Sequence, residues 1–134
     1  MISWAHDCAQ SVLPIFERVC PMDKRPRNAL ELARAMAQDR SCFRMKDVRE
    51  AALGAHAAAR ETKDQAARAA ARSAGHAVAT AHVTAHARGA VTYAAKAIME
   101  SGSLVDLKRM QRLHRLHRRF HEAAYPSWWM AKQK

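Results

Sequence analysis

The chain has 134 residues with a formal net charge of +11; 49% of them are hydrophobic, and it holds only 4 glycines and 4 prolines. So few glycines and prolines argue against a disordered chain or an all-β fold, and the absence of a long apolar run argues against a membrane span. The cysteines Cys8, Cys20 and Cys42 form no Cys-x-x-Cys pair, which argues against a disulfide framework. The N-terminus lacks the pattern of a signal peptide. We expect a soluble cytoplasmic protein with a single domain over residues 1–134.

Apolar residues recur at steps of three and four along most of the chain, which predicts an all-α fold of about six helices. The first helix should run from about residue 4 to 18. A kink or break is expected near Leu13, because Pro14 cannot donate a helical hydrogen bond. The second helix should begin near Pro26, since proline is well tolerated at the first helical position. The third should span about residues 46–61.

The middle of the chain is unusually rich in alanine, which occupies 21 of the fifty positions 51–100. Alanine is the best helix former and has almost no side chain. This segment should therefore form helices that approach closely, giving a compact antiparallel helical bundle with alanine-rich contacts. Gly75 should allow another backbone to come near.

Start and stop signals divide this segment into two helices. Thr62 or Asp64 is a suitable N-cap for the fourth helix, which should end near Thr80. The fifth helix should cover about residues 84–99 and end at the Ser-Gly-Ser of residues 101–103.

A last helix is expected over about residues 104–124, and it should end before the proline at position 126. Residues 101–134 hold eight Lys or Arg against two Asp or Glu, so this region is strongly basic. One side of the predicted helix is apolar, and the other carries cations at Lys108, Arg112, Arg115, Arg118 and Arg119. The cationic side is either a solvated outer face or a surface for an acidic protein partner. Nucleic acid and membrane contact are further alternatives, although no aromatic residues for base stacking alternate with the arginines.

The histidines of the middle segment are the first candidates for a site. His82 and His86 are four residues apart, a spacing that can hold zinc on one helix. However, no Cys or carboxylate stands beside them at metal spacing, and a helix break near His82 would separate the pair. We predict neither a metal nor a cofactor. The histidines are either buried and hydrogen-bonded, or part of a functional cluster of Arg72, His76, His82 and His86.

A row of cations offers a second candidate site. Arg68, Arg72 and His76 follow one another at steps of four, on one face of the fourth helix. With other arginines they could form an anion pocket; those arginines are Arg27, Arg34 and Arg60. The alternative is a solvated face, or structural ion pairs with the carboxylates of Glu31, Glu50, Glu61 and Asp64.

Motifs of known catalytic sites do not occur in the chain. It has no glycine-rich phosphate loop, no Gly-x-Ser-x-Gly turn, no His-Glu-x-x-His and no paired carboxylates. The alanine-rich segment is also poor in the acids that general acid–base chemistry uses. We therefore predict no catalytic residues and a protein that is not an enzyme.

Three stretches together resemble the immunity-protein-five-like family of bacterial immunity proteins. They are RPRNALELAR at residues 25–34, AHAAAR at residues 55–60, and AGHAVATAHV at residues 74–83 with its continuation to Ala97. The resemblance covers roughly residues 10–98 and leaves out the basic segment 104–134.

The resemblance implies an all-α fold and a protein that neutralises a cognate toxin of interbacterial competition. If that toxin presents an acidic surface, Arg112, Arg115, Arg118 and Arg119 are the residues expected to meet it. Two alternatives stay open: a nucleic-acid-binding helical protein, and a small-anion- or metal-binding protein that uses the histidine and arginine cluster.

Overall fold

The computed structural model describes residues 2–39, 41, 43–103, 108 and 111. These residues form five helices and no strand: α1 (Ile2–Val19), α2 (Arg25–Gln38), α3 (Met45–Glu61), α4 (Gln65–Ala79) and α5 (His86–Ser101). The all-α class is confirmed, with one helix fewer than the six or so expected. The expected last helix, over residues 104–124, lies almost wholly outside the described residues. Within the described part of the chain, no helix combines the length and the apolar character needed to cross a membrane.

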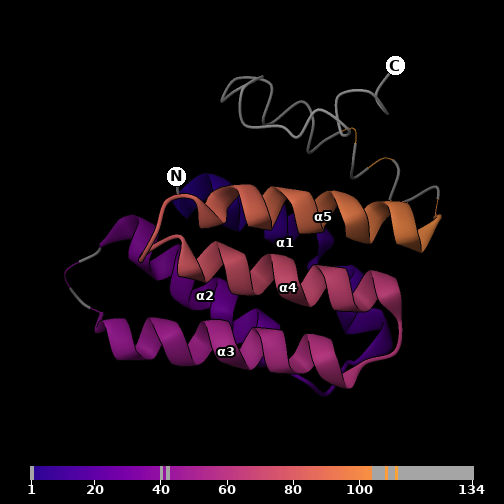
Figure 1. Ribbon diagram of the computed structural model, residues 1–134, viewed down its shortest axis with the longest axis horizontal. Helices are drawn as coiled ribbons and strands as arrows, with labels where there is room; N and C mark the ends of the chain where they lie inside the picture. The colour runs from indigo at the N-terminus through magenta and orange to yellow at the C-terminus, as the bar shows by residue number, and fades with distance from the viewer. Residues whose placement is uncertain (1, 40, 42, 104–107, 109–110, 112–134) are drawn as a thin grey trace.

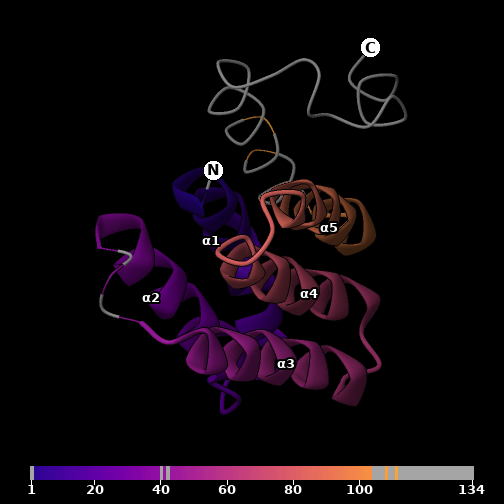
Figure 2. The same ribbon diagram turned by 60° about the vertical axis from the view of Figure 1, so that its left-hand side comes forward.

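The helices form two layers. In Figure 1, α3, α4 and α5 lie side by side and each runs antiparallel to the next, with α1 and α2 behind them. Figure 2 shows the same arrangement from the side. The central helix is α4, which packs against all four of the others.

Helix α1 runs without a break through Pro14, so the expected break near Leu13 is wrong. Around the proline, Leu13 and Phe16 have no exposed surface and Ile15 is 2% exposed. Burying each such side chain contributes roughly 1.5–3 kcal/mol. Together these contributions exceed the cost of a proline inside a helix, about 3 kcal/mol, and keep the helix continuous.

Small residues let α4 and α5 approach closely. Ala70, Ala74 and Ala77 of α4 are fully buried, as are Ala90 and Ala94 of α5. Between the two helices, the hydroxyl of Ser73 donates a 2.6 Å hydrogen bond to the carbonyl oxygen of Ala90. A short side chain can bond the backbone of the next helix only where the helices are nearly in contact, so the small residues set the distance between α4 and α5.

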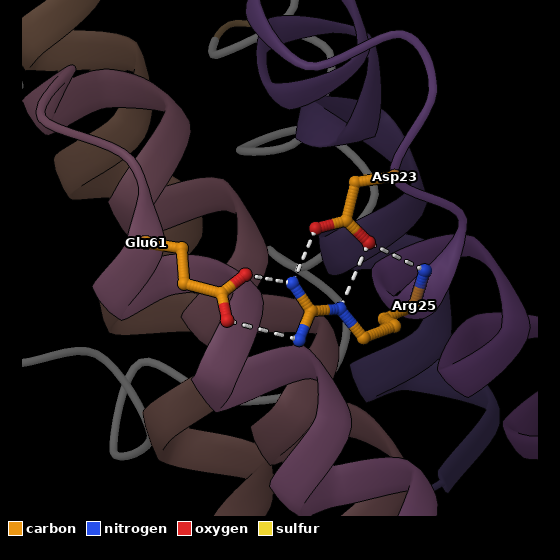
Figure 3. A network of polar contacts seen from close by, with 3 residues as sticks. All are labelled: Asp23, Arg25 and Glu61. Atoms are coloured by element: carbon orange, nitrogen blue, oxygen red, sulfur yellow. Dashed lines mark hydrogen bonds and ion pairs between the residues drawn. The ribbon is translucent and has the colours of Figure 1, made fainter.

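Arg25 joins the start of α2 to the end of α3, as Figure 3 shows. Its Nε and Nη2 donate to the two carboxylate oxygens of Asp23, at 3.0 and 2.7 Å. Both of its terminal nitrogens also donate to the carboxylate of Glu61. Hydrogen bonding to Arg25 holds the pKa of Asp23 below its usual range. The network therefore links two helix ends that lie 36 residues apart in the chain.

The tight packing around α4 makes a testable prediction. Ala74 has no exposed surface, so an Ala74→Leu side chain has no space and should lower the free energy of unfolding by roughly 1–3 kcal/mol. The matched control is Ala37→Leu on the exposed side of α2, which should change it by no more than about 0.5 kcal/mol. Urea unfolding followed by circular dichroism measures both. Equal stability of Ala74→Leu and the wild type would contradict the packing.

Candidate functional site

Two glycines make room for two histidine rings. A Cβ atom added at Gly89 in α5 would lie 2.5 Å from Nδ1 and 2.7 Å from Cγ of His76 in α4. A Cβ atom at Gly75 in α4 would lie 2.7 Å from Nε2 of His56 in α3. Real Cβ atoms do not come this close to other atoms, so each ring lies directly on a glycine. The atoms nearest to such a Cβ at Gly75 belong to a histidine ring, whereas the sequence suggested another backbone.

The ring of His76 is the centre of a cluster that joins three helices. Tyr93 of α5 stacks on it, with ring centroids 5.2 Å apart and an angle of 13° between the planes. The ring of His56 meets it edge-on at 5.2 Å. On α5, the Nδ1 atom of His86 is 3.1 Å from the Nδ1 atom of His76, and one of the two must carry the proton of this hydrogen bond. We call these four side chains the ring cluster.

The surroundings of the ring cluster favour neutral histidines. The pKa of His76 is lowered to about 4, first by burial and then by the nearby His56, His86 and Arg72. The pKa of His56 is also lowered, first by burial and then by Arg72, Arg60 and His86. Loss of water and neighbouring positive charge both disfavour the protonated ring. At neutral pH the centre of the cluster therefore carries no charge.

A polar hollow lies beside the ring cluster, between α4 and α5. Its volume is about 190 Å³, and it is lined by Gln65, Arg68, Ala69, Arg72, Tyr93 and Lys96. Tyr93 belongs to both features, because one face of its ring stacks on His76 while the side chain lines the hollow. We call this feature the α4–α5 hollow.

Hydrogen bonds to backbone fix one cation of the hollow. The Nε of Arg68 donates to the carbonyl of Ala59 at 3.2 Å, and its Nη2 donates to the carbonyl of Thr62 at 3.1 Å. These carbonyls belong to the last turn and the C-cap of α3, where helix carbonyls lack helical partners. Arg68 thus joins α4 to the end of α3 through its guanidinium group.

The structure brings three of the four residues of the predicted functional cluster together. His76 and His86 form a hydrogen bond, and Arg72 acts on the pKa of His76. His82 lies in the turn between α4 and α5, so it shares no helix face with His86. Its Nε2 is buried and has no hydrogen-bond partner among the described residues. Burial, Arg49 and His86 lower its pKa, in that order.

The structure brings together only some of the arginines of the predicted anion pocket. Arg68 and Arg72 line the α4–α5 hollow, but Arg27 instead forms a salt bridge with Glu17, in which its Nε lies 2.7 Å from the carboxylate. Arg34 lies exposed on α2 and does not line the hollow. Asp64, expected as an ion-pair partner, caps α4 by accepting a 2.8 Å hydrogen bond from the backbone of Ala67.

Four residues of the ring cluster and the α4–α5 hollow, or in contact with them, were not predicted from the sequence as site residues: His56, Gly89, Tyr93 and Lys96. A signal for the α5 residues was present, because positions 86, 89, 93 and 96 follow the three- and four-residue steps of one helix face. No comparable signal existed for His56, which meets its partners only through the packing of α3 on α4.

The remaining predicted site residues are Arg112, Arg115, Arg118 and Arg119, which lie outside the described residues. Over the part of the chain that the structure does describe, no group of three or more His, Cys, Asp or Glu side chains is arranged to hold a metal ion.

Residues 1–119 match the model of a family described as "Imm-5 like putative immunity protein". No curated protein and no solved structure matches the chain.

The lowered histidine pKa values predict a loss of stability in mild acid. Because the pKa of His76 is about 4 in the folded chain and about 6.5 when unfolded, the unfolded chain binds more protons between these values. The contribution of His76 to the free energy of unfolding should be largest above pH 6.5, fall as the pH is lowered to about 4, and change no further below that. His56 and His82 act in the same direction. The contribution of Asp23 is lost only below its usual pKa of 3.8, outside this window.

Urea unfolding between pH 4 and pH 7 measures this dependence, and His76→Asn is the matched variant. This variant removes the ring whose pKa is shifted most. It should make the free energy of unfolding change less steeply with pH between pH 4 and 6.5. An unchanged slope would show that His76 is not the group responsible.

The contact between Gly89 and His76 predicts opposite effects of one substitution at two glycines. Gly89→Ala should cost roughly 1–3 kcal/mol, because the Cγ of His76 is fixed near its own backbone and cannot move aside. At Gly54 of α3 the new Cβ would lie 3.9 Å from the side chain of Arg25, an ordinary contact. Gly54→Ala should therefore stabilise the chain by roughly 0.5–1 kcal/mol through helix propensity. Thermal unfolding of the two variants measures both effects. A loss of stability in Gly54→Ala equal to that in Gly89→Ala would contradict the prediction.

Proposed function

Because the chain belongs to this family of immunity proteins, we propose that it binds and neutralises a cognate bacterial toxin. Neutralisation is by binding alone, and the chain catalyses no reaction. It acts in the cytoplasm of the cell that it protects. The family match carries this proposal, since it includes all five described helices together with the residues of the ring cluster and the α4–α5 hollow.

The described surface has properties that suit a protein partner. Arginine and tyrosine are the residue types that, with tryptophan, most often dominate the energy of protein interfaces. Arg72 and Tyr93 stand together at the α4–α5 hollow on a closely packed pair of helices. Side chains held by such a framework lose little conformational entropy when a partner binds.

The charge of the chain favours an acidic toxin. With a formal net charge of +11, long-range attraction should speed the encounter with a negatively charged partner. The predicted basic residues Arg112, Arg115, Arg118 and Arg119 would add to this attraction, and they remain our candidates for the toxin contact.

The proposed function predicts a toxin gene beside the gene for this chain, and co-expression of the two genes tests it. The toxin alone should stop growth of the host, and the chain should restore it. The purified proteins should then elute together in size-exclusion chromatography. The mass of the toxin recovered from the complex should equal the mass of the free toxin. Protection without a complex, or a toxin altered in mass, would contradict neutralisation by binding.

The kinetics of the complex test the predicted contact. Reversing the charge at Arg112, Arg115, Arg118 and Arg119 should slow association by about tenfold or more at low salt and by less at high salt. Reversal at four exposed cations of the described helices and turns is the matched control, since it changes the net charge by the same amount; these residues are Lys24, Arg34, Lys63 and Arg88. If both sets slow association equally, the effect comes from net charge and not from the four predicted residues.

A further inference from the structure

Three cationic side chains surround the α4–α5 hollow. Arg68 and Arg72 reach it from α4, and Lys96 reaches it from the antiparallel α5. None of the side chains that line the hollow is acidic, and among the described residues no carboxylate forms an ion pair with any of the three cations. Elsewhere in the described part of the chain, Arg25 and Arg27 both have carboxylate partners. The hollow therefore gathers three positive charges that have no carboxylate partner among the described residues.

We propose that the α4–α5 hollow is a binding site for a phosphate group. A phosphate carries about −1.5 to −2 charges at pH 7 and three strong acceptor oxygens. Arg72 and Lys96 donate from opposite helices, and Arg68 adds positive charge beside them. Arginine suits this role because its planar fork matches the geometry of phosphate oxygens. A single carboxylate would compensate less of the charge.

The walls of the site are in place before any ligand arrives. Tyr93 is held by its stacking on His76, whose ring lies on Gly89. Arg68 is held by the carbonyls of Ala59 and Thr62. These two side chains need little further ordering when an anion binds, which favours affinity. The ring cluster thus has a role as the support of the site, since it positions one wall of the hollow.

The size of the hollow allows a phosphate group. Its volume of about 190 Å³ is far above the roughly 10–15 Å³ that one water molecule needs. The phosphate can be free or can belong to a phosphate monoester, whose substituent would extend from the hollow. This inference concerns a small ligand, and it is tested with phosphate alone, without the toxin.

Nuclear magnetic resonance of the full ¹⁵N-labelled chain tests the site. Inorganic phosphate is titrated at pH 7 with the ionic strength held constant by potassium chloride. The signals of Arg72 and Lys96, together with the backbone amides around them, should shift and saturate with a Kd of about 1 mM or tighter. Parallel titrations use phenyl phosphate as a monoester and glutarate as a dicarboxylate. Tighter binding of inorganic phosphate would mark a site for free phosphate, and tighter binding of phenyl phosphate a site for an ester.

Matched variants show whether the named residues are responsible. Arg72→Gln and Lys96→Gln should each weaken phosphate binding by about tenfold or more, because each removes a charge-assisted contact. Arg88→Gln removes an exposed charge of α5 that does not line the hollow, and it should leave the Kd unchanged. Unaltered spectra elsewhere show that the variants are folded.

Three results would overturn the inference. The first is a phosphate response no larger than that of chloride. The second is an Arg88→Gln effect equal to that of Arg72→Gln, which would mean diffuse attraction to the net charge. The third is glutarate binding as tight as phosphate binding, which would mean that the hollow recognises carboxylates equally well.

Discussion

The close contact between α4 and α5 is the constraint on which the rest of this molecule depends. At this contact the ring of His76 lies on Gly89, and Ser73 bonds the backbone of Ala90. The contact brings Tyr93 onto His76 and places Lys96 across from the arginines of α4. Larger residues at the glycine and alanine positions would move the helices apart and would remove both the ring cluster and the hollow. The small residues thus determine the geometry of the candidate site as well as the packing.

A core of small residues supplies little hydrophobic free energy, so stability must come from other parts of the chain. Each buried methylene contributes roughly 0.8 kcal/mol, and alanine has only a methyl group to bury. The three bulkiest fully buried side chains of the described residues, Leu13, Phe16 and Leu30, lie on α1 and α2, whereas no side chain larger than valine is fully buried on α3, α4 or α5. The layer of α1 and α2 therefore supplies the bulkiest side chains of the core, and the other layer can keep the small and polar residues that shape its surface.

Much of the fold, but little of the candidate site, could be predicted from the sequence. Helical periodicity and the cap at Asp64 predict the described helices to within a few residues, because both signals are local. The break expected near Pro14 was wrong because burial of the neighbouring side chains outweighs one lost hydrogen bond. The site depends on pairs that are far apart in the chain. His56 meets His76 only when α3 packs on α4, and no spacing within one helix encodes that meeting.

Neutral histidines beneath a cationic hollow connect the two parts of the site electrostatically. Arg72 helps to keep His56 and His76 unprotonated, because its charge disfavours a second positive charge nearby. An anion bound beside Arg72 offsets that charge and so favours protonation of the same rings. By linkage, protonation of the rings in turn strengthens the binding of an anion. The ring cluster and the hollow therefore share the side chain of Tyr93, and the charge of Arg72 couples them electrostatically.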